Sequence, residues 1–246
     1  MFVLPTFGFG VVASPTVPAF NTYSVNFDGT DDYIDLGTSS SLNPSSALTI
    51  SAWIYINGAG TGSLPTIYSS SKNSSGASGG IAIAYTSNKI RFYLDTTGSS
   101  GWVFAESNST VSTGQWYHLT GTWNGSTVTL YVNGTAQTTT ASASTIGYNT
   151  DFPATIGRYS SNYFNGLIDE VALFDSALNQ TQINNLRGGA SAGTLGTPDD
   201  ISSLNPLGWW RMGDNDGGTG TTITDQGSGG NNGTLTNGPT FSTSVP

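Results

Sequence analysis

The sequence predicts an all-β protein, built as a sandwich of two antiparallel sheets. Short runs that alternate bulky with small or polar residues recur along the chain, and turn residues separate them. Two such runs, Trp116–Trp123 and Thr127–Val132, flank an Asn-Gly dipeptide, which supplies the left-handed backbone of a tight hairpin turn. Charged residues make up only 9% of the chain, whereas 6 Trp, 11 Tyr and 11 Phe residues can form a buried core. These observations favour a folded sandwich over a disordered chain.

The expected strands are all short and bounded by turn residues. Residues 23–37 predict two strands around an Asp-Gly turn, and residues 48–57 alternate Ile or Ala with polar and aromatic residues. Residues 81–85 and 89–95 predict a hairpin whose turn lies at residues 86–88. Further strands are expected at residues 102–106, 154–157, 164–174, 207–212, 221–225, 234–235 and 240–242.

One short surface helix is expected near residue 180. Asn179 is a suitable N-cap, and Gln182 three residues later resembles the second half of a capping box. Ile183 and Leu186 give the helix a narrow apolar edge, and the Gly-Gly pair at residues 188–189 ends it.

Residues 1–22 are expected to form an extended apolar arm, because three prolines interrupt any helix there. A secretory signal is a weaker interpretation, since the segment lacks a basic n-region. Apolar side chains on such an arm need a surface that covers them, and we expect that surface to belong to a partner. The side chains expected to anchor the chain in this way are Phe2, Leu4, Phe7 and Phe9.

The rest of the chain divides into three parts. Residues 23–189 are expected to form the sandwich domain, and residues 190–206 read as a linker because they are small, polar and Pro-containing. Residues 207–246 are too few to build a core of their own. Their strands are therefore expected to complete the sandwich, either within the chain or by exchange with a neighbouring subunit.

Charge and cysteine content exclude several classes of partner and site. The net charge is −9, with only 6 Lys and Arg residues, so the chain has little means of binding nucleic acid phosphates. No apolar run approaches the ~18 residues of a membrane-spanning helix, so membrane insertion is not expected. Cysteine is absent, which excludes disulfides and thiolate metal sites.

Four segments resemble the laminin-G-like branch of the concanavalin A-like lectin/glucanase superfamily, whose members are jelly-roll sandwiches. They are residues 25–37 (VNFDGTDDYIDLG), 48–56 (LTISAWIYI), 115–135 (QWYHLTGTWNGSTVTLYVNGT) and 155–186, which includes the expected helix. Residues 209–241 resemble the segment that usually precedes the FDGxDDY strand in such modules, although here it follows the domain. The resemblance implies a jelly roll, circularly permuted or exchanged between subunits. In overall style the chain also resembles virion proteins of marine bacteriophages.

The resemblance further implies a structural Ca²⁺ ion where the last long strand meets the first. Asp169 stands at the position of the family's strand carboxylate, and Asp28 in the FDG turn is expected nearby. Calcium prefers carboxylate and carbonyl oxygens, which such loops provide. The competing interpretation is that Asp28, Asp31 and Asp32 only cap their own turn through backbone amides.

Enzymatic activity is not expected. A retaining glycosidase needs two carboxyl groups about 5 Å apart, and the glucanases of this superfamily carry them in a Glu-x-Asp-x-x-Glu run. Here Glu106 and Glu170 are far apart in the chain and lie in no such run. Asp169 and Glu170 are neighbours on an expected strand, so their side chains should point to opposite faces. His118, the only histidine, is expected to be structural.

The candidate glycan-binding residues are Trp102, Tyr159 and Tyr163, which accompany Gly, Asn and Ser backbone donors. Our leading prediction is a non-enzymatic structural, decoration or fibre protein of a virion, whose lectin-like jelly roll touches host-surface glycans. Its expected partners are other virion subunits, including copies of itself. The alternative is a secreted bacterial carbohydrate-binding lectin module with structural calcium, and a glycoside hydrolase is the third possibility.

Overall fold

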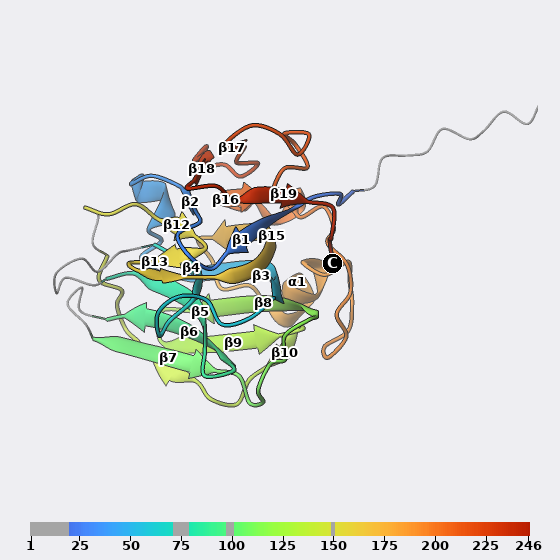
Figure 1. Cartoon of the computed structure of the whole chain (residues 1–246). Helices are drawn as coiled ribbons and strands as arrows, with labels where there is room; N and C mark the ends of the chain where they lie inside the picture. The colour runs from blue at the N-terminus through green and yellow to red at the C-terminus, as the bar shows by residue number, and fades with distance from the viewer. Residues whose placement is uncertain (1–19, 71–78, 97–100, 149–150) are drawn as a thin grey trace, which may run out of the picture.

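The structure is a computed structural model that describes residues 20–70, 79–96, 101–148 and 151–246. This part of the chain forms two antiparallel sheets packed as a sandwich, with one short α-helix on the outside (Figure 1). The prediction of an all-β sandwich with a short surface helix is therefore confirmed. Within the described ranges, no helix has the length and apolar character needed to cross a membrane.

The first sheet is built around the long central strand β15 (Asn165–Phe174). Each of its neighbours is antiparallel to it, although two of them, β1 and β3, come from far earlier in the chain. The sheet runs in the order β10 (Thr135–Ala136), β9 (Thr127–Val132), β8 (Trp116–Trp123), β3 (Leu48–Ile56), β15, β1 (Ser24–Asp28) and β19 (Thr240–Ser242), with β11 (Ala141–Ser142) paired to β9 and β16 (Gly208–Trp210) paired to β15.

The second sheet carries the hairpin that was expected across residues 86–88. Beside it lies a two-stranded hairpin of β13 (Arg158–Tyr159) and β14 (Asn162–Tyr163). The second sheet runs in the order β17 (Thr222–Ile223), β18 (Gly233–Thr236), β2 (Tyr33–Asp35), β12 (Thr155–Ile156), β4 (Thr66–Ser69), β5 (Ile81–Thr86), β6 (Lys89–Asp95) and β7 (Trp102–Glu106).

The main core lies between the two sheets, where alternate residues of each strand meet. Tyr117 and Leu119 of β8 point into it, whereas His118 between them points to the outer face of the first sheet. Gly121 allows close approach of the other sheet, because a Cβ atom there would lie 2.5 Å from the buried ring of Phe92. The close packing of the two sheets at this point therefore requires glycine at residue 121.

A second, smaller core covers the outer face of the first sheet. Ala172 and Phe174 of β15 pack against the helix α1 (Gln180–Asn185) and against Ile201. The capping box expected for α1 is present: Asn179 accepts from the Gln182 amide, and the Gln182 side chain accepts from the Asn179 amide. Residues 190–206, expected as a linker, thus contribute to a buried surface instead of spanning open solvent.

Buried Arg187 fixes the segment that follows α1. Its guanidinium group is inaccessible to solvent and donates to the carbonyl oxygens of Ala190 and Thr194 and to the Asn184 side chain. The two carbonyl acceptors belong to a loop that has no regular strand or helix pairing, and Asn184 belongs to α1. Hydrogen bonds from the Arg187 side chain thus hold this loop in place where backbone pairing does not.

The C-terminal residues join both sheets of this chain. β16 pairs with β15, β19 pairs with β1, and β18 pairs with β2. Asp214 also accepts hydrogen bonds from the amides of Thr22 and Tyr23, at 2.8 and 3.0 Å. The beginning and the end of the described chain therefore lie side by side (Figure 1).

Candidate functional site

An aromatic pocket opens on the outer face of the second sheet. It is lined by Leu64, Ala82, Tyr93, Trp102 and Tyr159 and has a volume of about 140 Å³. The three rings are each partly buried, so the pocket is accessible from solvent. We refer to these five residues as the aromatic pocket.

Strand alternation explains why these side chains meet. On β6, Phe92 and Leu94 point into the main core, so Tyr93 between them points outward. Ala82 of β5 lies directly opposite Tyr93 and is small enough to leave space. Trp102 comes from the first residue of β7, and Tyr159 comes from the β13–β14 hairpin, which contacts β4.

The rings stand edge to face. Trp102 and Tyr93 have ring centroids 6.1 Å apart at an interplanar angle of 89°, and Trp102 and Tyr159 are 6.2 Å apart at 90°. Such edge-on pairs are a favourable geometry for aromatic rings. The structure therefore brings two sequence-predicted residues, Trp102 and Tyr159, into one pocket and adds Tyr93. Tyr163 does not line this pocket: it pairs with Arg158 in the hairpin.

A charged pair lies next to the aromatic pocket. Arg91 donates through Nη1 to the Tyr93 hydroxyl at 3.2 Å and through Nε to Glu106 at 2.6 Å, and Lys89 Nζ lies 3.6 Å from Glu106. The Arg91 hydrogen bond lowers the pKa of Glu106 below its usual value. Glu106 is therefore an ionised partner of two cations. It lies four residues beyond Trp102 on β7, with Phe104 between them, so Arg91 and not Glu106 contacts a residue of the pocket.

The strand β15 contains a bulge that the sequence analysis missed. Asp169 lies opposite Trp53 and Ala172 opposite Ser51, so Glu170 and Val171 face a single residue of β3, and Glu170 has a φ of 45°. The residues on either side of the acidic pair, Ile168 and Val171, both point into the main core. The prediction that Asp169 and Glu170 point to opposite faces is therefore wrong, because the extra residue puts both on the outer face.

Both carboxylates are buried and engaged. Asp169 accepts from the Asn21 side chain at 2.9 Å, while Glu170 accepts from Trp209 Nε1 and, at 2.9 Å, from Arg211 Nε. Burial raises the pKa of Asp169 well above its usual value and that of Glu170 to about 7. The cavity beside Glu170 has a volume of about 10 Å³, room for roughly one water molecule. A cavity of this size has no room for a sugar residue.

His118 lines the same small cavity as Glu170. Its ring lies edge-on to Trp53 at 4.9 Å, and Nδ1 is 3.5 Å from Thr120 Oγ1. Burial lowers the pKa of His118 well below its usual value, and Arg187 adds to the effect. The imidazole is therefore a neutral, packed group, as a structural role requires.

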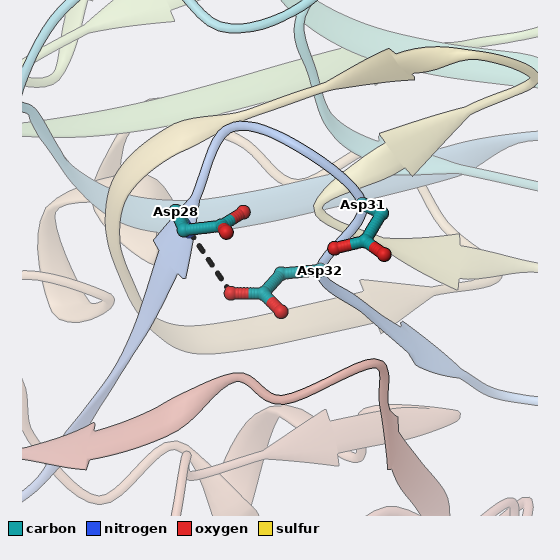
Figure 2. A group of neighbouring side chains, drawn as sticks. All are labelled: Asp28, Asp31 and Asp32. Atoms are coloured by element: carbon teal, nitrogen blue, oxygen red, sulfur yellow. Dashed lines mark hydrogen bonds between the residues drawn. The ribbon is translucent and has the colours of Figure 1, made fainter.

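Three carboxylates converge at the turn after β1. Figure 2 shows Asp28, Asp31 and Asp32, each with an oxygen within 4.8 Å of the others. Asp32 accepts from the Asp28 amide at 3.0 Å, and Asp28 accepts from the Thr30 amide at 2.7 Å. Burial raises the pKa of Asp32, and the charges of Asp28 and Asp31 raise it further. Backbone amides thus offset part of the charge, and oxygen ligands of the kind that Ca²⁺ prefers lie close together.

Asp169 does not belong to this group. Asp28 lies opposite Asn165 in the β1–β15 ladder, and Asp169 follows four residues further along β15, roughly 13 Å away at the usual strand rise. The expectation that Asp28 and Asp169 share one ion is therefore corrected by the strand register. Asp169 instead shares its surroundings with Glu170 and Asp214.

The expected anchoring residues Phe2, Leu4, Phe7 and Phe9 lie outside the described residues. Phe20 is the first residue that the structure describes. Its ring stacks on Trp209 with centroids 6.5 Å apart, and the Arg211 guanidinium lies 4.0 Å from the Phe20 ring. The segment that leads into β1 is thus held against the C-terminal strands.

Comparisons with known proteins extend the fold assignment. A family model described as the concanavalin A-like lectin/glucanases superfamily matches residues 28–184. Among solved structures, a putative carbohydrate binding protein from Bacteroides ovatus superposes with a TM-score of 0.67 at 20% identity, over 92% of this chain and 61% of that chain. This chain thus spans about three fifths of the length of that protein.

Two further structures share the fold. The CBM40 of Ruminococcus gnavus IT-sialidase, bound to α2,3-sialyllactose, has a TM-score of 0.55 at 11% identity and covers 66% of this chain and 95% of that chain. Domain 4 of AbnA, an extracellular arabinanase from Geobacillus stearothermophilus in complex with arabinotriose, has a TM-score of 0.51 at 20% identity, over 66% and 75%. No curated protein sequence matches the chain. Because the family model spans more than half of the sequence, the chain belongs to the concanavalin A-like lectin/glucanases superfamily.

Proposed function

We propose that this chain is a non-enzymatic carbohydrate-binding module and that the aromatic pocket is its glycan-binding site. The observation that carries the proposal is the convergence of Tyr93, Trp102 and Tyr159 around one accessible pocket. Ligand sites are concave and mostly apolar, with a few polar groups that fix orientation. The aromatic pocket supplies the apolar walls, and Arg91, which donates to the Tyr93 hydroxyl, supplies a charged group beside them.

The descriptions of structural neighbours support this proposal. The Bacteroides ovatus protein is described as a putative carbohydrate binding protein, and the sialidase and arabinanase domains were solved with oligosaccharides. The two settings expected from the sequence, a virion surface and a secreted bacterial lectin, both present such a module to glycans. We place the module in the virion setting first, with other virion subunits and further copies of this chain as its partners.

The placement of the acids supports binding without hydrolysis. Glu106 and Glu170 lie on different sheets, and each is paired with arginine. Retaining hydrolysis would need two carboxyl groups about 5 Å apart beside an accessible substrate. The aromatic pocket itself contains no carboxylate among its five lining residues.

The proposal is tested by measuring glycan binding to the wild type and to pocket variants. A glycan array identifies a ligand, and isothermal titration calorimetry then compares Trp102→Ala and Tyr159→Ala with the wild type. We expect each variant to lose at least about tenfold in affinity, as for central aromatic residues in binding sites. Trp116→Ala is the matched control, because Trp116 is also partly buried and packs edge-on against a tyrosine, but on the other sheet. Equal loss in the control, or none in the pocket variants, would contradict the proposal.

We include in the proposal a structural Ca²⁺ ion at the turn formed by Asp28, Asp31 and Asp32. The three converging carboxylates support it, since a cation would offset the repulsion that raises the pKa of Asp32. A ligand bound only by the folded state raises stability by mass action. The melting temperature should therefore rise with added CaCl₂ in the wild type and not in Asp31→Asn. Equal shifts in both proteins, or no shift in either, would remove the ion from this turn.

A further inference from the structure

We propose that the aromatic pocket selects glycans by a methyl group on a sugar ring. The methyl group is either C6 of a 6-deoxyhexose or the methyl of an acetamido substituent. This inference rests on the proposed function and specifies the class of glycan. Three features of the pocket lead to it: its volume, the orientation of its rings and the charge beside it.

The volume is too small for a whole sugar residue to be enclosed. The pocket measures about 140 Å³, whereas sites that enclose a drug-sized ligand usually measure about 300–1,000 Å³. A methyl group together with the ring carbon or carbonyl group that carries it fits the smaller space, whereas a methyl group alone would fill only a small part of it. The rest of the sugar would then lie over the rim, where Arg91 and the Tyr93 hydroxyl can meet its hydroxyl groups.

The rings enclose a guest from several sides. Trp102 stands at 89° to Tyr93 and at 90° to Tyr159, so the three rings do not form the flat platform on which a pyranose face stacks. Leu64 and Ala82 complete the lining with aliphatic carbon. A methyl group gains contact with carbon on each side. A hydroxymethyl group would exchange hydrogen bonds to water for a lining that is mostly carbon, which costs binding free energy.

The charge beside the aromatic pocket favours a neutral methyl group over a methylated cation as its guest. Aromatic cages also bind quaternary ammonium groups, through attraction to the ring faces. Here the Arg91 guanidinium donates to the Tyr93 hydroxyl at 3.2 Å, and the two cations Lys89 and Arg91 share the single carboxylate of Glu106, so the charge beside the pocket stays positive. That charge disfavours a cationic guest. A neutral methyl group satisfies both the shape and the charge.

The experiment compares sugars that differ only in the methyl-bearing group. L-fucose and L-galactose differ by the C6 hydroxyl, whereas N-acetylglucosamine and D-glucose differ by the acetamido group. Affinities are measured by NMR titration of the full chain, and saturation-transfer difference spectra identify the ligand protons nearest the protein. We expect one methyl-bearing sugar to bind about 10- to 100-fold more tightly than its partner. Its methyl protons should receive the strongest saturation. The sugar pair that discriminates identifies the source of the methyl group.

Two variants separate filling of the pocket from general damage. Ala82→Val adds carbon to the pocket lining and should lower the affinity for the methyl-bearing sugar at least tenfold. Ala84→Val is the matched control, since Ala84 lies two residues along β5 on the same face but does not line the pocket. The inference is supported only if the first variant alone weakens binding.

These experiments distinguish failure of the methyl preference from failure of the proposed glycan-binding function. If both members of each pair bind equally and Trp102→Ala still abolishes binding, the methyl preference is wrong and the glycan site stands. If no glycan binds, both proposals fall. If choline competes with the bound sugar, the pocket accepts a cation and methyl selection by a neutral group is overturned.

Discussion

Replacing Arg211 by methionine should expose the electrostatic cost of the buried acids on the outer face of the first sheet. Arg211 Nε lies 2.9 Å from Glu170 and Nη2 lies 3.2 Å from Asp214, and both carboxylate side chains are no more than 5% exposed. Asp169 adjoins the same group. Methionine keeps most of the length of the side chain and removes only its charge and hydrogen bonds. Glu170, Asp214 and Asp169 would then be buried without the positive charge that Arg211 supplies.

The expected loss is about 3–5 kcal/mol of unfolding free energy at pH 8, the usual cost of removing one partner of a buried ion pair. The loss should be smaller at pH 5.5. The folded-state pKa of Glu170 is raised from 4.5 to about 7, so this group favours folding most at low pH and loses that contribution as pH rises through 7. At pH 5.5 Glu170 is already protonated in the folded state, and the variant leaves less charge uncompensated.

Urea unfolding monitored by tryptophan fluorescence measures both values. Glu170→Gln should restore much of the stability of the Arg211→Met background, because glutamine still accepts from Trp209 without carrying charge. Arg91→Met is the control: its partner Glu106 has a side chain that is 21% exposed, so the expected cost is below about 1 kcal/mol. A loss below about 1 kcal/mol for Arg211→Met at pH 8, or equal losses at the two pH values, would refute the reasoning.

Three further predictions concern the core, the histidine and the arm. Because the folded-state pKa of His118 is lowered, His118→Asn should gain up to about 2 kcal/mol of unfolding free energy relative to the wild type as the pH falls from 6.5 to 5, as urea unfolding of both proteins at each pH will show. Gly121→Ala should cost about 1–3 kcal/mol by calorimetry, because its Cβ would lie 2.5 Å from Phe92, and an unchanged melting temperature would contradict that contact. Deleting residues 1–19 should lower the mass measured by light scattering towards that of the 25.5 kDa chain, and an unchanged mass would argue against anchoring by the arm.

Local patterns predicted most of the fold because short-range chemistry determines it. The hairpin of Trp116–Trp123 and Thr127–Val132 has the expected bounds, since an Asn-Gly turn leaves little choice of register. The helix cap at Asn179 was equally readable, because the capping box lies within four residues. Strand β4 (Thr66–Ser69) was missed, since its four residues do not show a clear alternation.

The candidate site depended on long-range register, which the sequence shows less directly. Trp102 and Tyr159 were chosen separately, and only the pairing of β6 with β7 and the placement of the β13–β14 hairpin reveal Tyr93 between them. A signal for the bulge did exist: two successive acids, Asp169 and Glu170, stand between apolar residues where strict alternation allows one. The same bulge explains why the expectation of opposite faces was wrong.

The two ends of the described chain lie on the same side of the sandwich, which distinguishes that side from the opposite one. In Figure 1 the chain enters β1 and reaches its C-terminus on one side, whereas β13 and the start of β7, which carry rings of the aromatic pocket, lie towards the opposite side. A partner or support attached to either end would therefore hold the sandwich from the side on which both ends lie. The rings of the aromatic pocket would project outward from that support, so, under the proposed function, many copies side by side could reach one polysaccharide without obstructing each other.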